Sequence, residues 1–226
     1  MPQLEPPGSV DELLSRAEAI AGLSLGHLAE KYQAYIPDNL LLEKGWVGQF
    51  LEYLLGASAG SLPQPDFPQL GIELKTLPVN ESGKPGESTY VSVVPMHENR
   101  YESWEQSVVK SKLSCVLWIP IVSPKGVATK ERIVGMPILW RPSIEEMHIL
   151  RMDWEEAMEK VALGRLGELN ARFGQALQVR PKAAHSRVIT DAIGPDGEKT
   201  KTLPRGFYLR PSFTGQILKN YYCQIG

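Results

Sequence analysis

The chain has 226 residues, of which 42% are hydrophobic and 22% are charged, and its formal net charge is −2. This composition is typical of a globular protein with one substantial core or two small lobes, and it argues against a generally basic nucleic-acid binder. No apolar run approaches the ~20 residues that cross a membrane, and the N-terminus lacks the features of a signal peptide. Cys115, one of two cysteines, lies in an apolar run, so we expect a buried free thiol and a cytoplasmic location.

The C-terminal part of the chain is basic, in contrast to the rest. From Arg180 to the end there are eight Lys or Arg residues and three acids, which gives this segment a charge of +5. The other residues must then carry −7, because the whole chain carries −2. We expect a polyanion to bind the basic segment with a salt-dependent affinity, and a merely solvated basic surface is the alternative.

Three helices are predicted in the first quarter of the chain. Ser9 and Glu12 form a capping-box pattern at the start of the first helix. Apolar spacing predicts a second helix at residues 25–32 and a central, largely buried helix at residues 47–55. Glu52 lies on this central helix, either as a solvated side position or as a third acid directed at the site that follows in the sequence.

The stretch from Asp66 to Lys75 reads D-F-P-Q-L-G-I-E-L-K and is the centre of the functional prediction. Residues 72–76 alternate apolar and polar, which predicts a half-buried strand with Glu73 and Lys75 on one face. A turn marked by proline and glycine precedes this strand. If the chain doubles back at that turn, Asp66 meets Glu73 and Lys75 at one end of the strand.

Two carboxylates and one ammonium group in such a site suit metal-assisted hydrolysis of a phosphodiester. Mg²⁺ prefers oxygen ligands and is usually held by one or two carboxylates together with substrate phosphate. A neighbouring lysine can orient the attacking water or help to deprotonate it. An exposed ion pair between Glu73 and Lys75 is the alternative interpretation of the same pattern.

The middle of the chain predicts further strands and one helix. A polar loop at residues 80–87 precedes a strand at 88–95, so that the two strands form a hairpin or part of a short mixed sheet. A helix is predicted at residues 101–113, with Lys112 near its end. Strands follow at 114–122 and 133–140, and together these elements indicate a mixed sheet with helices packed around it.

The last third of the chain is predicted to be mostly helical up to residue 173, with a helix opening at Asp153. A turn follows at residues 194–197, and a run of arginine and aromatic residues follows at 202–210. Arginine can contact phosphate or guanine and an aromatic ring can contact a base, so this run indicates a DNA contact. Aromatic core residues flanked by surface cations are the alternative, and a final helix is predicted at 215–222.

Several other site types are not expected. The four histidines are scattered without metal-ligand spacing, which argues against a zinc site. Gly83 and Lys84 do not form a phosphate-binding loop, and no other nucleotide motif occurs, so no intrinsic ATPase is expected. The nucleophile elbow of serine hydrolases is also absent from the sequence.

The whole pattern resembles the MutH family of methyl-directed mismatch-repair endonucleases, nearly from end to end. Its most specific segments are K-G-W-V-G-Q-F-L-E (44–52), P-D-F-P-Q-L-G-I-E-L-K-T (65–76), L-Q-V-R-P-K-A-A (177–184) and L-P-R-G-F-Y-L-R-P-S-F-T (203–214). The resemblance implies an α/β, restriction-endonuclease-like fold with a mixed sheet flanked by helices and two lobes around a DNA cleft. It implies one endonuclease domain over residues 1–226, with the catalytic motif at 66–75 and a DNA-reading segment at 177–226.

The resemblance also implies the activity and the roles of particular residues. The expected reaction is Mg²⁺-dependent nicking of the unmethylated strand at hemimethylated GATC sites, 5′ to the G, with one or two ions. Asp66, Glu73 and the backbone carbonyl of Leu74 would be metal ligands, and Lys75 would be the catalytic lysine. Two accessory active-site residues would be Glu52 and Lys112.

The expected DNA contacts and partners follow from the same resemblance. The DNA-binding residues would be Lys44, Arg180, Lys182, Arg205, Tyr208 and Arg210, and the ring of Tyr208 would sense methylation of adenine N6. The activator would be MutL, working with MutS, and a single short domain favours a monomer that nicks. A GATC-specific type II restriction endonuclease and a catalytically silent DNA-binding module are the alternatives.

Overall fold

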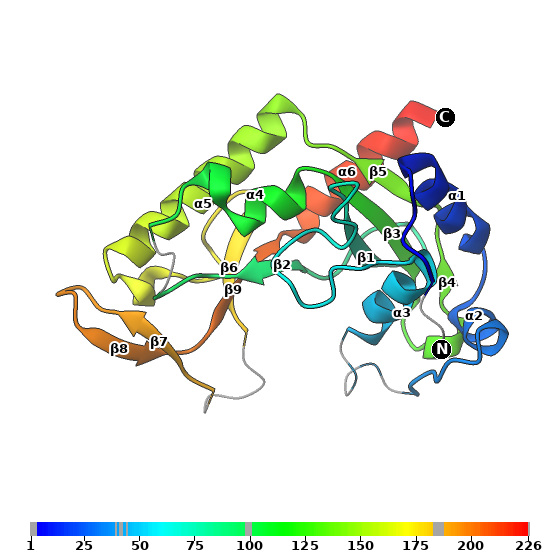
Figure 1. Cartoon of the computed structure of the whole chain (residues 1–226), viewed down its shortest axis with the longest axis horizontal. Coiled ribbons are helices and arrows are strands. Elements are labelled where there is room, and N and C mark those ends of the chain that lie inside the picture. Colours follow the sequence, from blue (N-terminus) through cyan, green and yellow to red (C-terminus); the bar gives the residue numbers. More distant parts are fainter. Residues whose placement is uncertain are drawn as a thin grey trace. The chain divides into compact units, whose positions relative to one another are not determined.

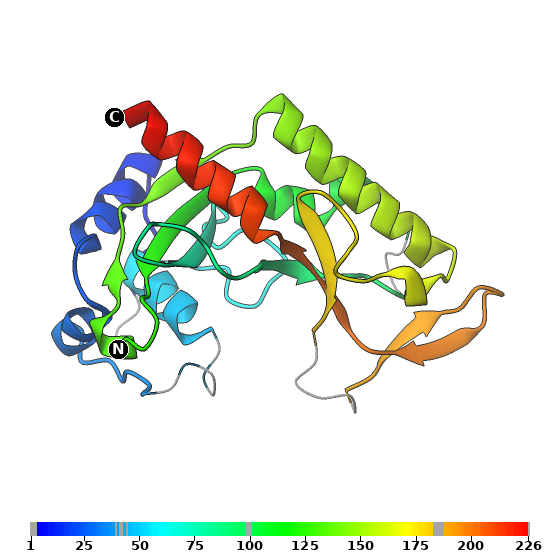
Figure 2. The same cartoon turned by 180° about the vertical axis from the view of Figure 1, so that it is seen from behind.

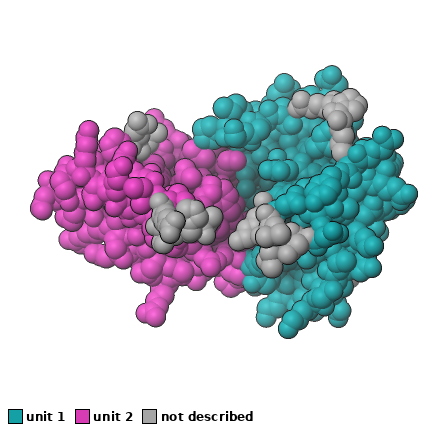
Figure 3. All heavy atoms as spheres, turned by 90° about the horizontal axis from the view of Figure 1, so that it is seen from below, with its two compact units in different colours: residues 1–87, 114–141, 215–226 teal, residues 88–113, 142–214 magenta. Residues whose placement is uncertain are grey.

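The structure is a computed structural model that describes residues 4–38, 40, 43, 45–97, 101–182 and 188–225. The expected DNA-binding residue Lys44 lies outside these residues. The chain forms two compact units, which Figure 3 shows in separate colours. Unit 1 consists of residues 1–87, 114–141 and 215–226, and unit 2 consists of residues 88–113 and 142–214.

A four-stranded mixed sheet forms the centre of unit 1 (Figure 1). Its strands are β1 (Glu73–Val79), β3 (Val116–Val122), β4 (Ile133–Val134) and β5 (Ile138–Trp140). The long strands β1 and β3 pair in parallel, with Glu73 opposite Val116 and Leu74 opposite Leu117. Strand β3 pairs with β4 and β5 in antiparallel fashion. Because β3 is buried along almost its whole length, its sequence is continuously apolar.

Helices cover this sheet, as Figures 1 and 2 show from opposite sides. The helices at the N-terminal side are α1 (Val10–Ile20), α2 (Leu25–Lys31) and α3 (Trp46–Leu55), and a short 3₁₀ helix spans Thr129–Glu131. The hydroxyl of Ser9 accepts a hydrogen bond from the backbone of Glu12, so the predicted Ser9 cap of α1 is confirmed. The second bond of the predicted capping box differs, because the carboxylate of Glu12 accepts from the amide of Gly8 and not from that of Ser9. The apolar faces of α1, α2 and α3 pack with Leu74 and Leu117 into one buried core.

Unit 2 contains a second sheet and a separate hairpin. The three-stranded sheet has the order β2 (Thr89–Val93), β9 (Arg205–Leu209) and β6 (Leu177–Pro181), all antiparallel. The hairpin consists of β7 (Thr190–Ile193) and β8 (Lys199–Thr202), joined at the predicted turn. The helical elements of unit 2 are α4 (Val108–Leu113), α5 (Ile144–Ala162) and 3₁₀ turns at Trp104–Gln106 and Leu166–Glu168.

The mixed α/β class is confirmed, but several predicted elements differ from the structure. Strand β2 does not pair with β1, so the predicted hairpin or shared sheet is wrong. The two strands belong to different sheets because β1 takes β3 as its partner and β2 takes β9. The final helix α6 (Pro211–Ile225) is longer than predicted and begins in unit 2 and continues in unit 1.

The single helix predicted at residues 101–113 is broken into a 3₁₀ turn and α4. Ser107 has an extended backbone at the break, with a ψ angle of 142°. Its hydroxyl donates to the carbonyl of Trp104 and accepts from the amide of Lys110. A serine that bonds to the backbone on both sides competes with a continuous helix, which explains the break.

Two other boundaries also need correction. The strand predicted at 133–140 is divided into β4 and β5, because Gly135 leaves the strand geometry and donates its amide to the carbonyl of Pro120. The helix predicted to open at Asp153 begins nine residues earlier, where Ser143 and Glu146 form a complete capping box. Asp153 is therefore buried in the middle of α5, and the continuation predicted to residue 173 is only a 3₁₀ turn.

Two sequence-based expectations on burial and membranes can be compared with the fold. Cys115 is free and buried, as predicted. Among the helices of the described residues, none combines the length and the apolar character that crossing a lipid bilayer requires.

Candidate active site

The turn before β1 brings Asp66 back onto the strand. Phe67 and Ile72 form an isolated antiparallel bridge with hydrogen bonds in both directions. Gly71 closes the turn in the left-handed conformation, with a φ angle of 64°, which glycine adopts without strain. One carboxylate oxygen of Asp66 then accepts a hydrogen bond of 2.8 Å from the backbone amide of Leu74. The predicted doubling back of the chain is therefore confirmed.

Glu73 and Lys75 lie on the same face of β1, opposite the core face that carries Leu74. The ammonium group of Lys75 donates to Glu73 Oε1 at 2.5 Å. The side chain of Glu73 is only 1% exposed and that of Lys75 is 13% exposed, so the pair is not an ordinary surface ion pair. A buried ion pair contributes little to stability by itself, because both charges lose their hydration.

The carboxyl group of Asp66 has an unusual pKa. Burial and the negative charge of Glu73 raise the pKa of Asp66 to about 6, and the charge of Glu52 adds to this rise. The amide of Leu74 and the charge of Lys75 act in the opposite direction but do not compensate. Negative charge is therefore in excess at this buried place, which a bound cation would relieve.

Glu52 joins this cluster from the central helix α3. Its charge acts on Asp66, and α3 packs against β1. A methyl group added at Gly48 would lie 3.8 Å from Glu52 Oε1 and 4.0 Å from the hydroxyl of Thr76, so Gly48 leaves room beside both. Of the two interpretations of Glu52, a third acid near the site and a solvated position, the first fits this arrangement.

The donor set suits a hard divalent cation. Asp66 and Glu73 offer carboxylate oxygens, and a single lysine opposes three acids in their vicinity. Within the described residues, no group of three or more acidic, histidine or cysteine side chains is placed so that it could hold a metal ion. Two carboxylates completed by backbone oxygen, water and phosphate are typical of Mg²⁺ rather than of zinc or calcium.

One face of the second sheet, in unit 2, carries three of the six predicted DNA-binding residues. Tyr208 on β9 stands opposite Gln178 on β6 and opposite Tyr90 on β2. Because side chains alternate along a strand, Arg180 and Lys182 share the face of Gln178. The other face carries buried Leu177, Val179 and Phe207.

The side chains on this face contact one another. The guanidinium group of Arg180 bonds to the hydroxyl of Ser88 and lies 5.8 Å from the ring centre of Tyr208. Lys182 Nζ lies 2.5 Å from the hydroxyl of Tyr90 and 3.9 Å from the centre of its ring. The rings of Tyr90 and Tyr208 pack edge to face, with 5.3 Å between their centres. This face therefore presents two cations and two aromatic rings as one connected group.

Gly206 lies close to the rings of both tyrosines. A methyl group at this position would lie 3.0 Å from a ring carbon of Tyr90 and 3.1 Å from one of Tyr208. The pKa of Tyr208 is raised above its ordinary value, mainly by burial. The neighbouring cations Lys182 and Arg180 lower it and Tyr90 raises it, but the cations do not compensate for the burial. Burial lowers the pKa of Lys182.

Sequence reasoning missed Tyr90 and Ser88. Tyr90 lies in the predicted strand S-T-Y-V-S, but only its pairing with β9 places it beside Tyr208. The signal that was available in the sequence is a tyrosine whose alternate neighbours in the strand, Ser88 and Ser92, are polar. Without the order of the strands, that signal does not identify a partner 118 positions away in the sequence.

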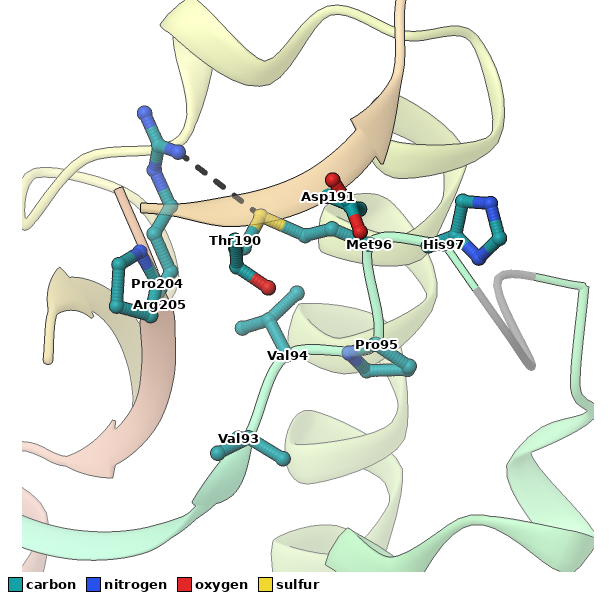
Figure 4. Close-up of a pocket in the computed structure, with 9 residues that line it drawn as sticks. All are labelled: Val93, Val94, Pro95, Met96, His97, Thr190, Asp191, Pro204 and Arg205. Carbon is teal, nitrogen blue, oxygen red and sulfur yellow. Dashed lines mark hydrogen bonds between the residues drawn. The ribbon is translucent and has the colours of Figure 1, made fainter. Parts of the chain in front are cut away.

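Arg205 and Arg210 stand apart from this connected group. Figure 4 shows Arg205 at a pocket of about 320 Å³ in unit 2, beside Met96 and Pro204. Its guanidinium group donates to the hydroxyl of Thr202 and to the carbonyl of Leu203. The residues that line this pocket do not include Asp66, Glu73 or Lys75.

Arg210 has a different environment from the one that a DNA contact predicts. Its guanidinium group donates to the backbone carbonyls of Ala171, Phe173 and Gly174, at 2.7 to 2.9 Å. These bonds hold a loop of unit 2, and the expected DNA contact of Arg210 stays a prediction. Lys112 lies in the last turn of α4 and belongs to unit 2, whereas the carboxylates belong to unit 1.

Comparisons with known proteins agree with these observations. Residues 55–153, which include Asp66, Glu73 and Lys75, match the family model described as DNA mismatch repair enzyme MutH. The chain is 52% identical to the DNA mismatch repair protein MutH of Shewanella woodyi, over 96% of this chain and 94% of that protein. It is 52% identical to the protein of the same name from Vibrio cholerae, over 96% of this chain and 98% of that protein.

A third relative extends the match to another genus. The DNA mismatch repair protein MutH of Haemophilus influenzae is 49% identical over 95% of this chain and 96% of its own length. Proteins that are this similar over nearly their whole length share the same fold. The chain belongs to the MutH family of DNA mismatch repair endonucleases, which have a restriction-endonuclease-like fold.

Proposed function

We propose that this endonuclease nicks the unmethylated strand of hemimethylated GATC sites, 5′ to the G, in a reaction that requires Mg²⁺. The observation that carries the proposal is the buried cluster in which Asp66 is tied to the strand of Glu73 and Lys75. The names of the relatives support a role in mismatch repair. The sequence and strand preference rests on the family resemblance of the segments that carry Arg180 and Tyr208.

The residues of the cluster have separate tasks in this proposal. Asp66, Glu73 and the carbonyl of Leu74 would hold one or two Mg²⁺ ions, and Glu52 would support them. Bound Mg²⁺ lowers the pKa of a coordinated water and offsets the negative charge that develops on the phosphate. Lys75, held by Glu73, would orient the attacking water or help to deprotonate it. Lys112 is proposed as an accessory residue.

The face of β2, β6 and β9 would contact DNA. Arg180 and Lys182 supply positive charge, and the rings of Tyr90 and Tyr208 supply flat surfaces beside it. Methylation of adenine N6 removes a donor proton and adds bulk at the edge of the base. A ring in close contact with that edge, for which Tyr208 is our candidate, would detect both changes.

The proposed partners follow from the family. The chain would act in the bacterial cytoplasm as a monomer that MutL activates together with MutS. An external activator is consistent with a sequence that has no nucleotide-binding motif. A monomer with one cluster would cut one strand at a time, which suits strand-directed repair.

The proposal is tested with plasmids that differ only in GATC methylation, incubated with the protein, Mg²⁺ and, in a second series, MutL. Nicked circles from unmethylated and hemimethylated plasmid, and none from fully methylated plasmid, are the expected result. Linear product would instead indicate a restriction endonuclease that cuts both strands. The absence of any product, with MutL present, would indicate a silent DNA-binding module.

A further inference from the structure

Asp153 is a buried charge that the proposed chemistry does not use. It lies in the middle of α5 and is 7% exposed. Its carboxylate accepts hydrogen bonds from the backbone amides of Gln175, Ala176 and Leu177, at 2.6 to 2.9 Å. A carboxylate that binds three successive amides forms strong charge-assisted bonds and fixes the backbone locally.

Arg210 holds the same loop from the other side. Its guanidinium group binds the carbonyls of Ala171, Phe173 and Gly174, and its backbone amide donates to the carbonyl of Ala176. The loop is thus held by an anion at its amides and by a cation at its carbonyls. The side chains of Asp153 and Arg210 therefore both fix the backbone of residues 171–177.

Gly174 permits the tight turn between these two groups. It has a left-handed backbone, with a φ angle of 75°. A methyl group at this position would lie 1.8 Å from the carbonyl oxygen of Leu177 and 3.1 Å from the carboxyl carbon of Asp153. No side chain fits there, so the loop can approach Asp153 only with glycine at residue 174.

The loop leads directly into β6, the strand that carries Arg180. Leu177, the last residue bound by Asp153, is the first residue of β6. A strand rises ~3.3 Å per residue, so Arg180 lies about 10 Å farther along. Among the described strands, β6 is an edge strand with β9 as its neighbour, which makes its start dependent on other contacts.

We propose that Asp153 is a positioning residue for DNA binding, with Arg210 as its counterpart. The pair fixes the start of β6, and thereby sets where Arg180 stands on the DNA-contacting face. Neither residue touches DNA or the carboxylate cluster in this scheme. The inference rests on the proposed function, because it assumes that this face contacts DNA.

The test is a double-mutant cycle between Asp153→Asn and Arg180→Ala, with KM and kcat measured for a hemimethylated GATC duplex in Mg²⁺. Asn preserves the shape of Asp but removes the charge that binds the three amides. We expect Asp153→Asn to raise KM about tenfold with kcat within about twofold of the original protein. In the Arg180→Ala background the same substitution should raise KM by less than about twofold, because the positioned group is gone.

The matched control is Glu156→Gln, three residues along the same helix. Glu156 is exposed and paired with Lys160, so its neutralisation should leave KM unchanged. Amide hydrogen exchange provides a second readout. In Asp153→Asn the amides of Ala176 and Leu177 should exchange faster, whereas those of β3 in unit 1 should not change.

The outcomes separate this inference from the proposed function. If Arg180→Ala raises KM and Asp153→Asn does not, Asp153 is not a positioning residue, whereas the proposed DNA contact of this face is retained. If the two KM increases multiply in the double variant, Asp153 acts independently of Arg180 and the inference is also wrong. If neither substitution raises KM, the DNA-contacting face itself is wrong, and the inference falls with it.

Arg210→Ala keeps the test decisive if Asp153→Asn does not fold. The guanidinium group is partly exposed, so its removal is expected to loosen the loop without unfolding unit 2. We expect KM to rise severalfold in the original protein and hardly at all in the Arg180→Ala background. An equal rise in both backgrounds would instead mean that Arg210 contacts DNA directly, which overturns its role as a positioning residue.

Discussion

The carboxylate cluster in unit 1 and the proposed DNA-contacting face in unit 2 are assembled in different ways. Asp66, Glu73 and Lys75 lie within ten residues and are brought together by a single turn. On the other face, Arg180 meets Ser88 and Lys182 meets Tyr90 across 92 positions of the sequence. The proposed chemistry therefore depends on a local motif, and the proposed recognition of DNA depends on the pairing of distant strands. Substitutions in the two regions should consequently affect different kinetic parameters.

The largest effect is expected for Glu73→Gln, which keeps the volume of the side chain and removes its charge. Nicking should fall below detection, because a proposed ligand of Mg²⁺ and the partner of Lys75 are lost together. DNA affinity, measured by fluorescence anisotropy, should stay within about twofold of the original protein. Glu81→Gln, at an exposed position of the loop after β1, is the control that should keep full activity.

Lys75→Ala should reduce kcat by ~10²–10⁴-fold, the usual contribution of general acid–base catalysis. The affinity for Mg²⁺ should be retained or increase slightly, since the carboxylates remain and lose their neutralising neighbour. Calorimetric titration with Mg²⁺ measures that affinity. A variant that no longer binds the metal would show that Lys75 supports the site rather than the chemistry.

Local features of the sequence predicted the carboxylate cluster well. The turn at Gly71 and the alternation of residues 72–76 are sufficient to place Asp66 beside β1, because only short-range geometry is involved. The place of Glu52 could be decided only from the packing of α3 against β1, which the sequence does not show.

The unit 2 face could not be predicted in the same way. The order β2-β9-β6 pairs segments far apart in the sequence, and periodicity gives no information on which strands are neighbours. The pairing of β2 was therefore assigned wrongly, and Tyr90 was missed. A DNA contact by Arg210 stays a prediction, and periodicity gave no indication that its guanidinium group also donates to backbone carbonyls of unit 2.

The raised pKa of Asp66 makes the cluster a source of instability in the absence of metal. The folded-state pKa is about 6 and the ordinary value is 3.8, so the folded state holds the proton more tightly than the unfolded state between these values. The free energy of unfolding should therefore fall as pH rises from about 4 to about 6. The full penalty above pH 6 is about 3 kcal/mol.

Asp66→Asn tests this penalty, because its amide oxygen can still accept the hydrogen bond from Leu74. In EDTA, urea unfolding at pH 8 should show the variant to be more stable than the original protein by about 3 kcal/mol, relative to their difference at pH 4. Added Mg²⁺ should stabilise only the original protein. A difference between the two proteins that does not change with pH would contradict the raised pKa.

Arg180→Ala acts on the other region and should weaken DNA binding by ~1–3 kcal/mol if the guanidinium group contacts a base. If it contacts phosphate, binding should weaken for all sequences and the salt dependence should become shallower by about one charge. Both cases predict a change in KM with kcat maintained. Lys125→Ala, an exposed cation in unit 1, is the control for the loss of one positive charge.

The smallest effect is expected for Tyr208→Ser, and it concerns selectivity instead of rate. Loss of the ring should narrow the ratio of nicking rates on hemimethylated and fully methylated DNA by about fivefold, which corresponds to ~1 kcal/mol of base discrimination. Tyr208→Phe should keep most of the ratio, because the ring that packs against Tyr90 and lies near Arg180 remains. Tyr101→Ser, at a residue 71% exposed in unit 2, is the control for an unrelated tyrosine. If the ratio is unchanged in Tyr208→Ser, methylation is detected elsewhere, and Tyr90 becomes the next residue to replace.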